Sequence, residues 1–511
     1  MEYSWAGLGR VYPPATVGAN EWSTYSPAEA FHLSLLHVAE NSCPARAPAG
    51  AFRHARLLPG RLRSALDTTS GPGPTPTEWE GSTMTRIPGR RPSRRLGRAL
   101  AAAAVLLLSP ASPAAAQDPT PPPAPPAGLA VDMEAPDSLI RAITSDLRAA
   151  EGSEQFQGNP RTLEERMAEL GIPAVSVAVV EGGRIHWARA WGVANPESGR
   201  PANRHTLFQA ASISKAVAGV GALRLVEDGK LELDGPVNHH LTRWRIPVHE
   251  WEASAPVTLR HLLTHTGGLT VHGFPGYGPD DPVPPLTAVL DGQAPANTAA
   301  VLVDQEPGTA WRYSGGGTSI LQLAVEEVTG QRFDDWMASQ VLVPAGMTSS
   351  TYAQPLPDSL HDRVATAHRG DGSMVAGGWH TYPEQAAAGL WTTPTDLARW
   401  ILAVQRAAGT PGVEAGAALS PLLEEATARA MLSEGMGRWG LGLTVQGEGE
   451  HHRFSHGGAN AGYRAQVVGW VEASRGIAIM TSSDAGGVVA SELMAAIVRA
   501  YGWPAPPSPE E

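Results

Sequence analysis

Lysine is nearly absent from this chain of 511 residues, and one of its lysines follows a serine at a spacing that suits chemistry. Against 36 arginines, the only lysines are Lys215 and Lys230. Arginine stays protonated under ordinary conditions, whereas a desolvated lysine can lose its proton and act as a base. Ser212 precedes Lys215 by three residues, and residues three apart at the start of a helix lie on one face. The pair therefore predicts a serine nucleophile with a lysine base.

A structural reading of the same pair stands beside the chemical one. Apolar residues at helical spacing predict a helix over 212–228, ended by Gly229. In that helix Ser212 could be a simple N-cap and Lys215 a solvated charge, because Ser-x-x-Lys also arises by chance. In the chemical reading, the helix N-terminus also points free N–H groups at whatever Ser212 attacks.

The surrounding elements have an order that could position such a pair. Alternating and apolar runs predict a β-hairpin over 172–180 and 184–192, turning at Gly182 and Gly183. Signals from residue 203 to about 436 are mainly helical, including a helix over 318–329. Strands are expected again at 440–446, 463–471 and 476–482, before a last helix over 488–501. Strands at both ends with helices between predict an α+β fold: an α/β lobe whose sheet uses both termini, with a helical lobe inserted and a cleft where they meet.

Seven segments in order carry a resemblance to a known family. They are IPAVSVAVVEGGRI, FQAASISKAV, LVEDGKLELD, VTLRHLLTHTGGL, PGTAWRYSGGGTSILQ, AAGLWTTPTDLARW and HGGANAGYRA. The chain resembles the serine β-lactamase and penicillin-binding-protein superfamily over roughly 137–502, most closely the class C branch with its related esterases and D-amino-acid peptidases. The resemblance implies a class C β-lactamase/transpeptidase-like fold, an antiparallel sheet flanked by helices with an inserted, mostly helical lobe.

The resemblance also implies four catalytic residues. Ser212 would be the acylated nucleophile, Lys215 its general base or proton carrier, and Tyr313 the phenol that shuttles a proton between Ser212 and the leaving group. His456 would occupy the third motif, where many members have lysine. For useful proton exchange we expect the pKa of Lys215 to fall from about 10.4, and that of Tyr313 from about 10, toward neutrality.

A substrate-binding set follows from the same resemblance: Gly315, Gly457, Gly458, Ala459 and Asn460. The two glycines of the third motif would let substrate lie against an edge strand, and the backbone N–H groups of Ser212 and Ala459 would form an oxyanion hole. Gly315 stands where the family usually has asparagine. We expect this change to open the cleft beside Tyr313 and to weaken a β-lactamase assignment more than a general acyl-hydrolase one.

Other kinds of site find little support in the sequence. His261 and His265 lack the glutamate of an H-E-x-x-H zinc motif, so we expect a structural role for them beneath the cleft. Glu250 and Glu384 have no identifiable acid partner and are interpreted as ordinary side chains. No G-x-S-x-G elbow or phosphate loop is present, and the only cysteine is Cys43. We therefore expect neither a metal nor a cofactor.

A segment near the N-terminus predicts an exported enzyme, and the charge of the remaining chain limits its partners. Residues 84–116 have the basic, apolar and A-x-A parts of a signal peptide, with cleavage expected near Ala116, and their apolar run is too short to span a bilayer. We interpret 1–83 as an upstream mis-start or a disordered extension, 117–136 as a Pro-rich linker, 137–505 as the hydrolase domain and 506–511 as a disordered tail. Residues 117–511 carry 26 basic and 43 acidic side chains, which disfavours nucleic acid and anionic membranes as partners.

The sequence thus predicts a periplasmic or secreted serine hydrolase that acts on a small-molecule ester, a peptide or a β-lactam. An esterase or a D-amino-acid peptidase is preferred. A class C-type β-lactamase and a non-catalytic penicillin-binding receptor remain alternatives, and the oligomeric state is left open.

Overall fold

The computed structural model describes residues 136–148, 159–413 and 421–504. The segments interpreted as the mis-start or extension, the signal peptide and the C-terminal tail lie outside the described residues, as does all of the linker except Pro136.

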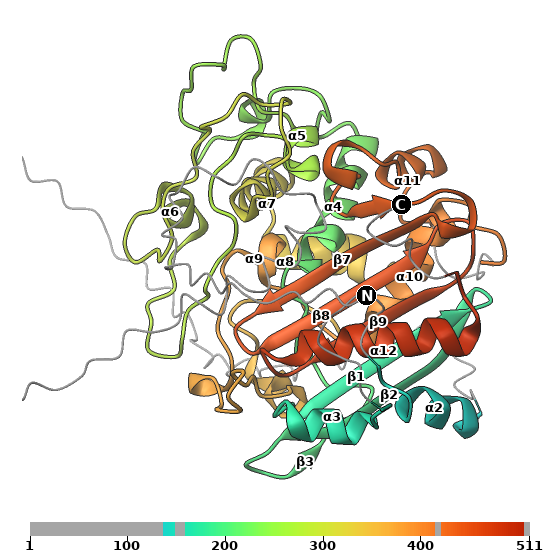
Figure 1. The fold of residues 1–511 in the computed structure, drawn as a ribbon. Coiled ribbons are helices and arrows are strands. Elements are labelled where there is room, and N and C mark those ends of the chain that lie inside the picture. The colour runs from blue at the N-terminus through green and yellow to red at the C-terminus, as the bar shows by residue number, and fades with distance from the viewer. Residues whose placement is uncertain (1–135, 149–158, 414–420, 505–511) are drawn as a thin grey trace, which may run out of the picture. The chain divides into compact units, whose positions relative to one another are not determined.

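Seven strands form one sheet in the order β3-β2-β1-β9-β8-β7-β6. Their bounds are β1 Ala174–Glu181, β2 Arg184–Asn195, β3 Arg200–Pro201, β6 Thr444–Gln446, β7 Arg453–Asn460, β8 Tyr463–Trp470 and β9 Gly476–Thr481. Each neighbouring pair in this sheet is antiparallel. Val177 of β1 lies opposite Ile479 of β9, so the first long strand pairs with the last one (Figure 1). This confirms the prediction of one sheet built from both ends of the domain.

Strand β1 is apolar except at Ser176 and Glu181, because both faces of the sheet are covered there. Val175, Val177 and Val179 pack into a core cluster that also contains Leu493 of α12. Val180 belongs to a second cluster, on the α10 side of the sheet. The β1–β2 turn lies at Gly182 and Gly183, whose φ angles of 59° and 74° favour glycine.

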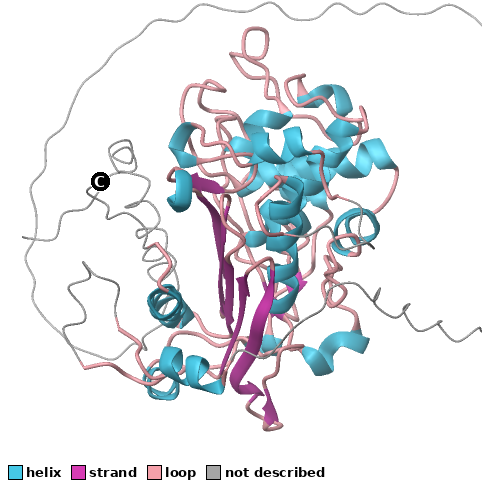
Figure 2. Ribbon diagram, turned by 90° about the vertical axis from the view of Figure 1, so that its right-hand side faces the viewer, coloured by secondary structure: helices cyan, strands magenta, loops and turns pink. Residues whose placement is uncertain are grey.

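Helices lie on both faces of the sheet (Figure 2). The longer ones are α2 Asp137–Thr144, α3 Leu163–Glu169, α4 Ile213–Glu227, α7 Gly315–Thr329, α10 Pro394–Ala407, α11 Glu425–Met431 and α12 Gly486–Tyr501. The shorter ones are α5 Leu259–Thr264, α6 Leu286–Asp291, α8 Phe333–Met337 and α9 Gln385–Ala388. Helix α12 crosses the sheet over β8 and β9 and also contacts α2 and α3, whereas α10 packs against β1 and β9 from the other side (Figure 1).

The mostly helical lobe predicted between the two sets of strands is present. Its α4 helix is buried around almost its whole circumference, because α7 and α9 pack against it. A second, two-stranded sheet joins β4 Phe208–Gln209 to β5 Trp391–Thr392, so the segment before Ser212 pairs with the segment after α9.

The strand predictions differ from the structure at β7 and β6, and the two-residue strands β3, β4 and β5 were not predicted. Strand β7 was not predicted, because Gly457 and Gly458 weaken the strand signal of its sequence. The strand expected over 440–446 begins only at Thr444, since the chain before it turns at Gly437 and Gly442, with φ angles of 69° and 97°.

Of the helices in the described parts of the chain, none is long and apolar enough to cross a membrane.

Candidate active site

Ser212 lies at a sharp turn between β4 and α4. The residue before it, Ala211, has a φ of 49°, which is uncommon for a residue with a side chain. The Ser212 side chain accepts no hydrogen bond from the free N–H groups of α4. Instead, Lys215 Nζ donates to Ser212 Oγ over 3.0 Å. The alternative of a simple N-cap therefore fails, and the hydroxyl contacts the amine expected from the spacing.

Lys215 is buried, and its amine has no charged partner among the residues that the structure describes. It is 4% exposed, and its Nζ also donates to the carbonyl oxygen of Ala387 over 2.7 Å. Desolvation lowers the pKa of Lys215 to about 7. A large share of the amine is therefore neutral near pH 7, and a neutral amine beside Ser212 can accept the proton of its hydroxyl.

Tyr313 completes a compact group with these two residues. Lys215 Nζ lies 5.0 Å from the centre of the Tyr313 ring. Burial raises the pKa of Tyr313 above its usual value, and the hydrogen bond between its phenol and Ser212 lowers it by less. The expectation that this pKa falls toward neutrality is therefore wrong: burial penalises the phenolate. The phenol stays protonated at neutral pH and can donate its proton.

His456 brings a neutral imidazole to this group. Its ring centre lies 6.3 Å from that of Tyr313 and 5.4 Å from that of Trp439. Nδ1 lies 2.6 Å from the carbonyl oxygen of Gly457, which assigns the proton to Nδ1. Burial, followed by the charge of Lys215, lowers the pKa of His456 to about 3. The ring therefore supplies no positive charge where many relatives have lysine, and its buried Nε2 has no hydrogen-bond partner among the described residues.

Half of strand β7 forms a free edge beside Ser212. Strand β6 pairs with β7 only up to Ser455, which leaves the later residues unpaired on that side. Ala459 is exposed on this edge and lies opposite Arg464 of β8. No hydrogen bond among the described residues uses the backbone N–H of Ser212. These two residues are the ones expected to supply the oxyanion hole.

Gly458 and Asn460 fit the fold more closely than they fit a substrate. A Cβ on Gly458 would lie 2.1 Å from the carbonyl oxygen of Ala210, so glycine lets β7 pack against the segment before Ser212. The amide of Asn460 donates to Gln209 Oε1 over 2.8 Å and to the carbonyl oxygen of Ala388 over 3.1 Å. Both of its donors are occupied, so the amide ties β7 to β4 and α9.

Gly315 does not open the site as expected. A Cβ on Gly315 would lie 3.0 Å from both the carbonyl oxygen of His272 and Phe274 Cε2. The Gly315 N–H donates to the same His272 carbonyl over 3.0 Å. The space beside Tyr313 that the missing side chain was expected to leave is therefore filled by a loop.

That loop contributes His272, a histidine that no pattern in the sequence indicated. The His272 ring centre lies 4.9 Å from that of Tyr313. Burial and the charge of Lys215 lower the pKa of His272, so its imidazole is neutral. The residue before it, Val271, has a φ of 62°, a strained conformation for a β-branched residue. Such strain is common at functional sites, although only the structure reveals it here.

Glu384 is not an ordinary side chain. It is fully buried at the start of α9, and neither carboxylate oxygen has a hydrogen-bond partner among the described residues. Burial raises the pKa of Glu384 to about 8. Its sequence neighbours gave no signal of this, because burial here depends on packing against distant segments. Glu250, by contrast, is exposed.

The two histidines of helix α5 have different environments. His261 Nδ1 accepts from the Thr258 N–H, and the His261 N–H donates to Thr258 Oγ1; together the two hydrogen bonds form a capping box. His265 packs against Tyr313, with the ring centres 4.3 Å apart. Both histidines therefore make contacts within the fold, one at the helix start and one against Tyr313.

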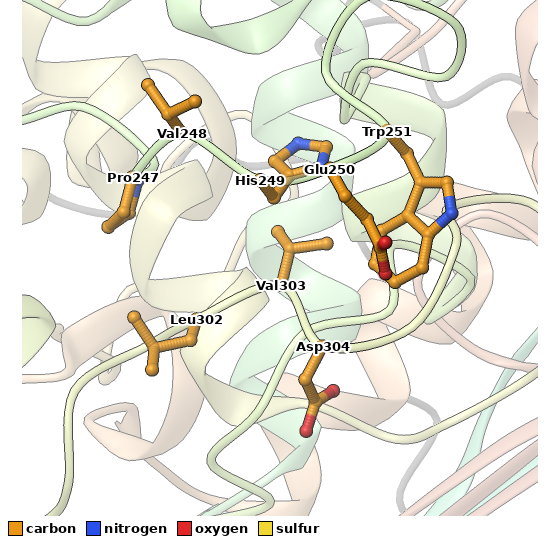
Figure 3. Close-up of a pocket in the computed structure, with 8 residues that line it drawn as sticks. All are labelled: Pro247, Val248, His249, Glu250, Trp251, Leu302, Val303 and Asp304. Atoms are coloured by element: carbon orange, nitrogen blue, oxygen red, sulfur yellow. The ribbon is translucent and has the colours of Figure 1, made fainter.

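A surface groove on the inserted lobe is separate from these residues. It has a volume of about 330 Å³, and none of the predicted site residues lines it (Figure 3). Its walls are formed by Pro247, Val248, His249, Glu250, Trp251, Leu302, Val303 and Asp304.

Comparison with known sequences finds a matching family model and several relatives. A family model described as Beta-lactamase matches residues 160–500. Esterase EstB of Burkholderia gladioli is 31% identical over 205 residues, which are 38% of this chain and 51% of EstB. Protein flp of Staphylococcus aureus strain N315 is 24% identical over 246 residues, 47% of each chain. The chain thus spans about half the length of the curated relatives it matches.

Solved structures agree with the predicted fold class. A crystal structure of SurE with D-Leu is similar with a TM-score of 0.52 and 25% identity, covering 68% of this chain and 76% of SurE. The D-alanine carboxypeptidase AmpC of Burkholderia cenocepacia has a TM-score of 0.52 and 19% identity, covering 72% of this chain and 99% of AmpC. The α+β, class C β-lactamase/penicillin-binding-protein fold is thereby confirmed.

Proposed function

Because the chain belongs to the Beta-lactamase family, we propose that it is an exported serine hydrolase that forms an acyl-enzyme on Ser212. The observation that carries this proposal is the contact of 3.0 Å between the desolvated amine of Lys215 and the Ser212 hydroxyl. A nucleophile paired with a base whose pKa is near neutrality is the arrangement that acyl transfer requires.

In the acylation step, neutral Lys215 takes the proton of Ser212 while Oγ bonds to the carbonyl carbon of the substrate. The N–H groups of Ser212 and Ala459 stabilise the oxyanion that develops. Tyr313 then donates its phenolic proton to the leaving oxygen or nitrogen as the bond to carbon breaks. The ammonium of Lys215 returns a proton to Tyr313, so the serine proton has in effect moved to the leaving group.

In the deacylation step, a water molecule replaces the leaving group. Lys215 and Tyr313 take one proton from this water as its oxygen attacks the acyl carbon. The bond to Ser212 Oγ breaks, Oγ recovers the proton, and the carboxylic acid leaves. Since the amine starts and ends neutral, no metal or cofactor is needed for proton balance.

Short esters and D-amino-acid peptides are the proposed substrates. Similarity to an esterase supports the first class, and similarity to SurE, whose structure holds D-Leu, supports the second. At position 315 the chain offers no side-chain amide to a β-lactam. A substrate amide left without a partner costs about 1–3 kcal/mol, or about ten- to a hundredfold in rate. A simple ester has no such group.

The test compares kcat/KM for p-nitrophenyl butyrate, a D-alanyl dipeptide and a cephalosporin, with Ser212→Ala as the blank. The proposal expects turnover of the ester or the peptide in preference to the cephalosporin. Preference for the cephalosporin would favour the class C-type β-lactamase, and one stoichiometric burst without turnover would favour the penicillin-binding receptor.

Export is the remaining part of the proposal, and it depends on residues 84–116 alone. N-terminal sequencing of the native mature protein is expected to begin near Gln117. A mature protein that retains any of residues 1–83 would overturn it.

A further inference from the structure

His265 lies at the end of helix α5 in a conformation that few side chains adopt. It is the C-cap of that helix, with φ 57° and ψ 34°. Histidine is among the residues that tolerate this left-handed region better than most. The turn brings both the backbone carbonyl and the imidazole of His265 against the segment that carries Tyr313.

His265 holds the chain on both sides of Tyr313. The N–H of Arg312 donates to the His265 carbonyl oxygen over 2.8 Å. The N–H of Ser314 donates to His265 Nδ1 over 3.2 Å. Between these two hydrogen bonds, the Tyr313 ring packs on the imidazole with a centre-to-centre distance of 4.3 Å and an angle of 42° between the planes. One residue therefore restrains the backbone and the ring of Tyr313 together.

The imidazole of His265 is neutral, so its Nδ1 can accept the hydrogen bond from Ser314. Because Nδ1 accepts from a backbone N–H, the proton of the neutral ring is on Nε2. Burial, followed by the charge of Lys215, holds the pKa of His265 well below its usual value. The side chain is 3% exposed. Nδ1 thus remains an acceptor under ordinary conditions, and the restraint on Ser314 persists.

We propose that His265 is a positioning residue that holds the Tyr313 phenol where it delivers a proton to the leaving group. This inference rests on the proposed function. The other rings around Tyr313 are less closely placed, with His272 at 4.9 Å and Trp439 at 5.7 Å. A displacement of about 1 Å at a catalytic group can cost about a hundredfold in rate. The loss of His265 should therefore appear in the step that uses the phenolic proton.

Comparing esters with different leaving groups distinguishes a loss of Tyr313 positioning from a general loss of stability. A nitrophenolate departs without a proton, whereas an alkoxide needs one. For His265→Phe, which keeps a ring but leaves the Ser314 N–H unpaired, kcat/KM for ethyl butyrate is expected to fall about a hundredfold. The fall for p-nitrophenyl butyrate should be at least tenfold smaller. Tyr313→Phe is expected to give the same pattern with a larger amplitude.

Two further variants complete the design. His265→Asn keeps an acceptor near the Ser314 N–H and should recover part of the ethyl butyrate activity; it also carries the comparison if the Phe variant does not fold. His261→Phe removes the capping histidine of the same helix and should affect both esters equally. When Tyr313 is already replaced by phenylalanine, the additional change His265→Asn should cause no further loss of kcat/KM for ethyl butyrate. This comparison can be made even if the variants are less stable.

An equal loss for both esters in the His265 variants, or additive losses in the double variant, would overturn the inference. If the unaltered protein hydrolyses neither ester nor the D-alanyl dipeptide, the proposed function itself is wrong. The two failures are therefore distinguishable.

Discussion

The amine of Lys215 lies 3.0 Å from the hydroxyl of Ser212 and 2.7 Å from the carbonyl oxygen of Ala387. No ion pair among the described residues involves that amine. Both contacts are to neutral oxygens, so no opposite charge offsets the cost of burying a charge, and the amine gives up its proton more readily than an exposed lysine does. An arginine guanidinium in the same place would keep its proton, so Lys215 can act as a base where the arginines of the chain cannot.

Replacing Lys215 by arginine should abolish most of the activity although the positive charge is kept. A guanidinium cannot release a proton at working pH, so the base is lost and kcat/KM should fall by about 100- to 10,000-fold. Lys230→Arg is the matched control, since Lys230 is exposed and its nearest acid is Asp228 at 3.7 Å. Steady-state kinetics on p-nitrophenyl butyrate measures both variants. Near-normal turnover of Lys215→Arg would mean that Lys215 acts only through its charge.

The pH profile of kcat/KM should rise through a single limb centred near pH 7. Activity is absent while Lys215 is protonated and appears as its proton leaves, and its pKa is about 7. His456, whose pKa is about 3, stays neutral across this range. Tyr313, whose pKa is raised by burial, stays protonated. A profile that is flat between pH 5 and 9, or that falls as pH rises through 7, contradicts the assignment of Lys215 as the base.

Replacing Glu384 by glutamine should stabilise the protein at alkaline pH. The pKa of Glu384 is raised from 4.5 to about 8 in the folded state. The folded state therefore holds a proton that the unfolded chain releases, and the resulting stability, present below pH 4.5, is lost as pH rises through 8. Glutamine has no such loss, so the variant should gain up to about 4 kcal/mol over the native protein at pH 9 and little at pH 5.

Denaturant unfolding at the two pH values measures this difference, with exposed Glu250 replaced by glutamine as the control. An equal effect of Glu384→Gln at pH 5 and pH 9 would show that the carboxyl is ionised when folded.

Replacing Gly458 by alanine should reduce both stability and activity. The new Cβ would lie 2.1 Å from the carbonyl oxygen of Ala210, so either β7 or the turn before Ser212 must move. Overpacking of this kind costs about 1–3 kcal/mol. Gly487→Ala is the control, because a Cβ there meets no atom within 4 Å. Thermal unfolding and kcat are measured together. A Gly458→Ala variant as stable and as active as the control would show that β7 does not pack closely against the carbonyl oxygen of Ala210.

Local sequence patterns predicted the helices and turns better than they predicted the contacts between distant segments. Helix α4 begins at Ile213 and the β1–β2 turn lies at Gly182 and Gly183, as expected, because spacing and glycine conformation are local properties. The pairing of Ser212 with Lys215 is also local, being one helical turn. The proximity of Tyr313 was implied only by the family resemblance, since Tyr313 lies 98 positions after Lys215 in the chain.

What the sequence could not predict depends on long-range packing. The loop at His272 that fills the space beside Gly315 was missed because the two segments meet only in the folded chain. The raised pKa values of Tyr313 and Glu384 have the same origin, since burial by distant segments sets them. Strand β7 was missed because its partner β8 supplies the stability that its glycines lack.

Covalent labelling tests the central claim most directly. After exposure of the purified protein to a fluorophosphonate, intact-mass spectrometry and peptide mapping should find one adduct per chain, on Ser212, and none in Ser212→Ala. Ser214 is the neighbouring competitor, but it is fully buried and its Oγ accepts from the Leu390 N–H over 3.0 Å. An adduct on Ser214, or undiminished labelling of Ser212→Ala, would contradict the account.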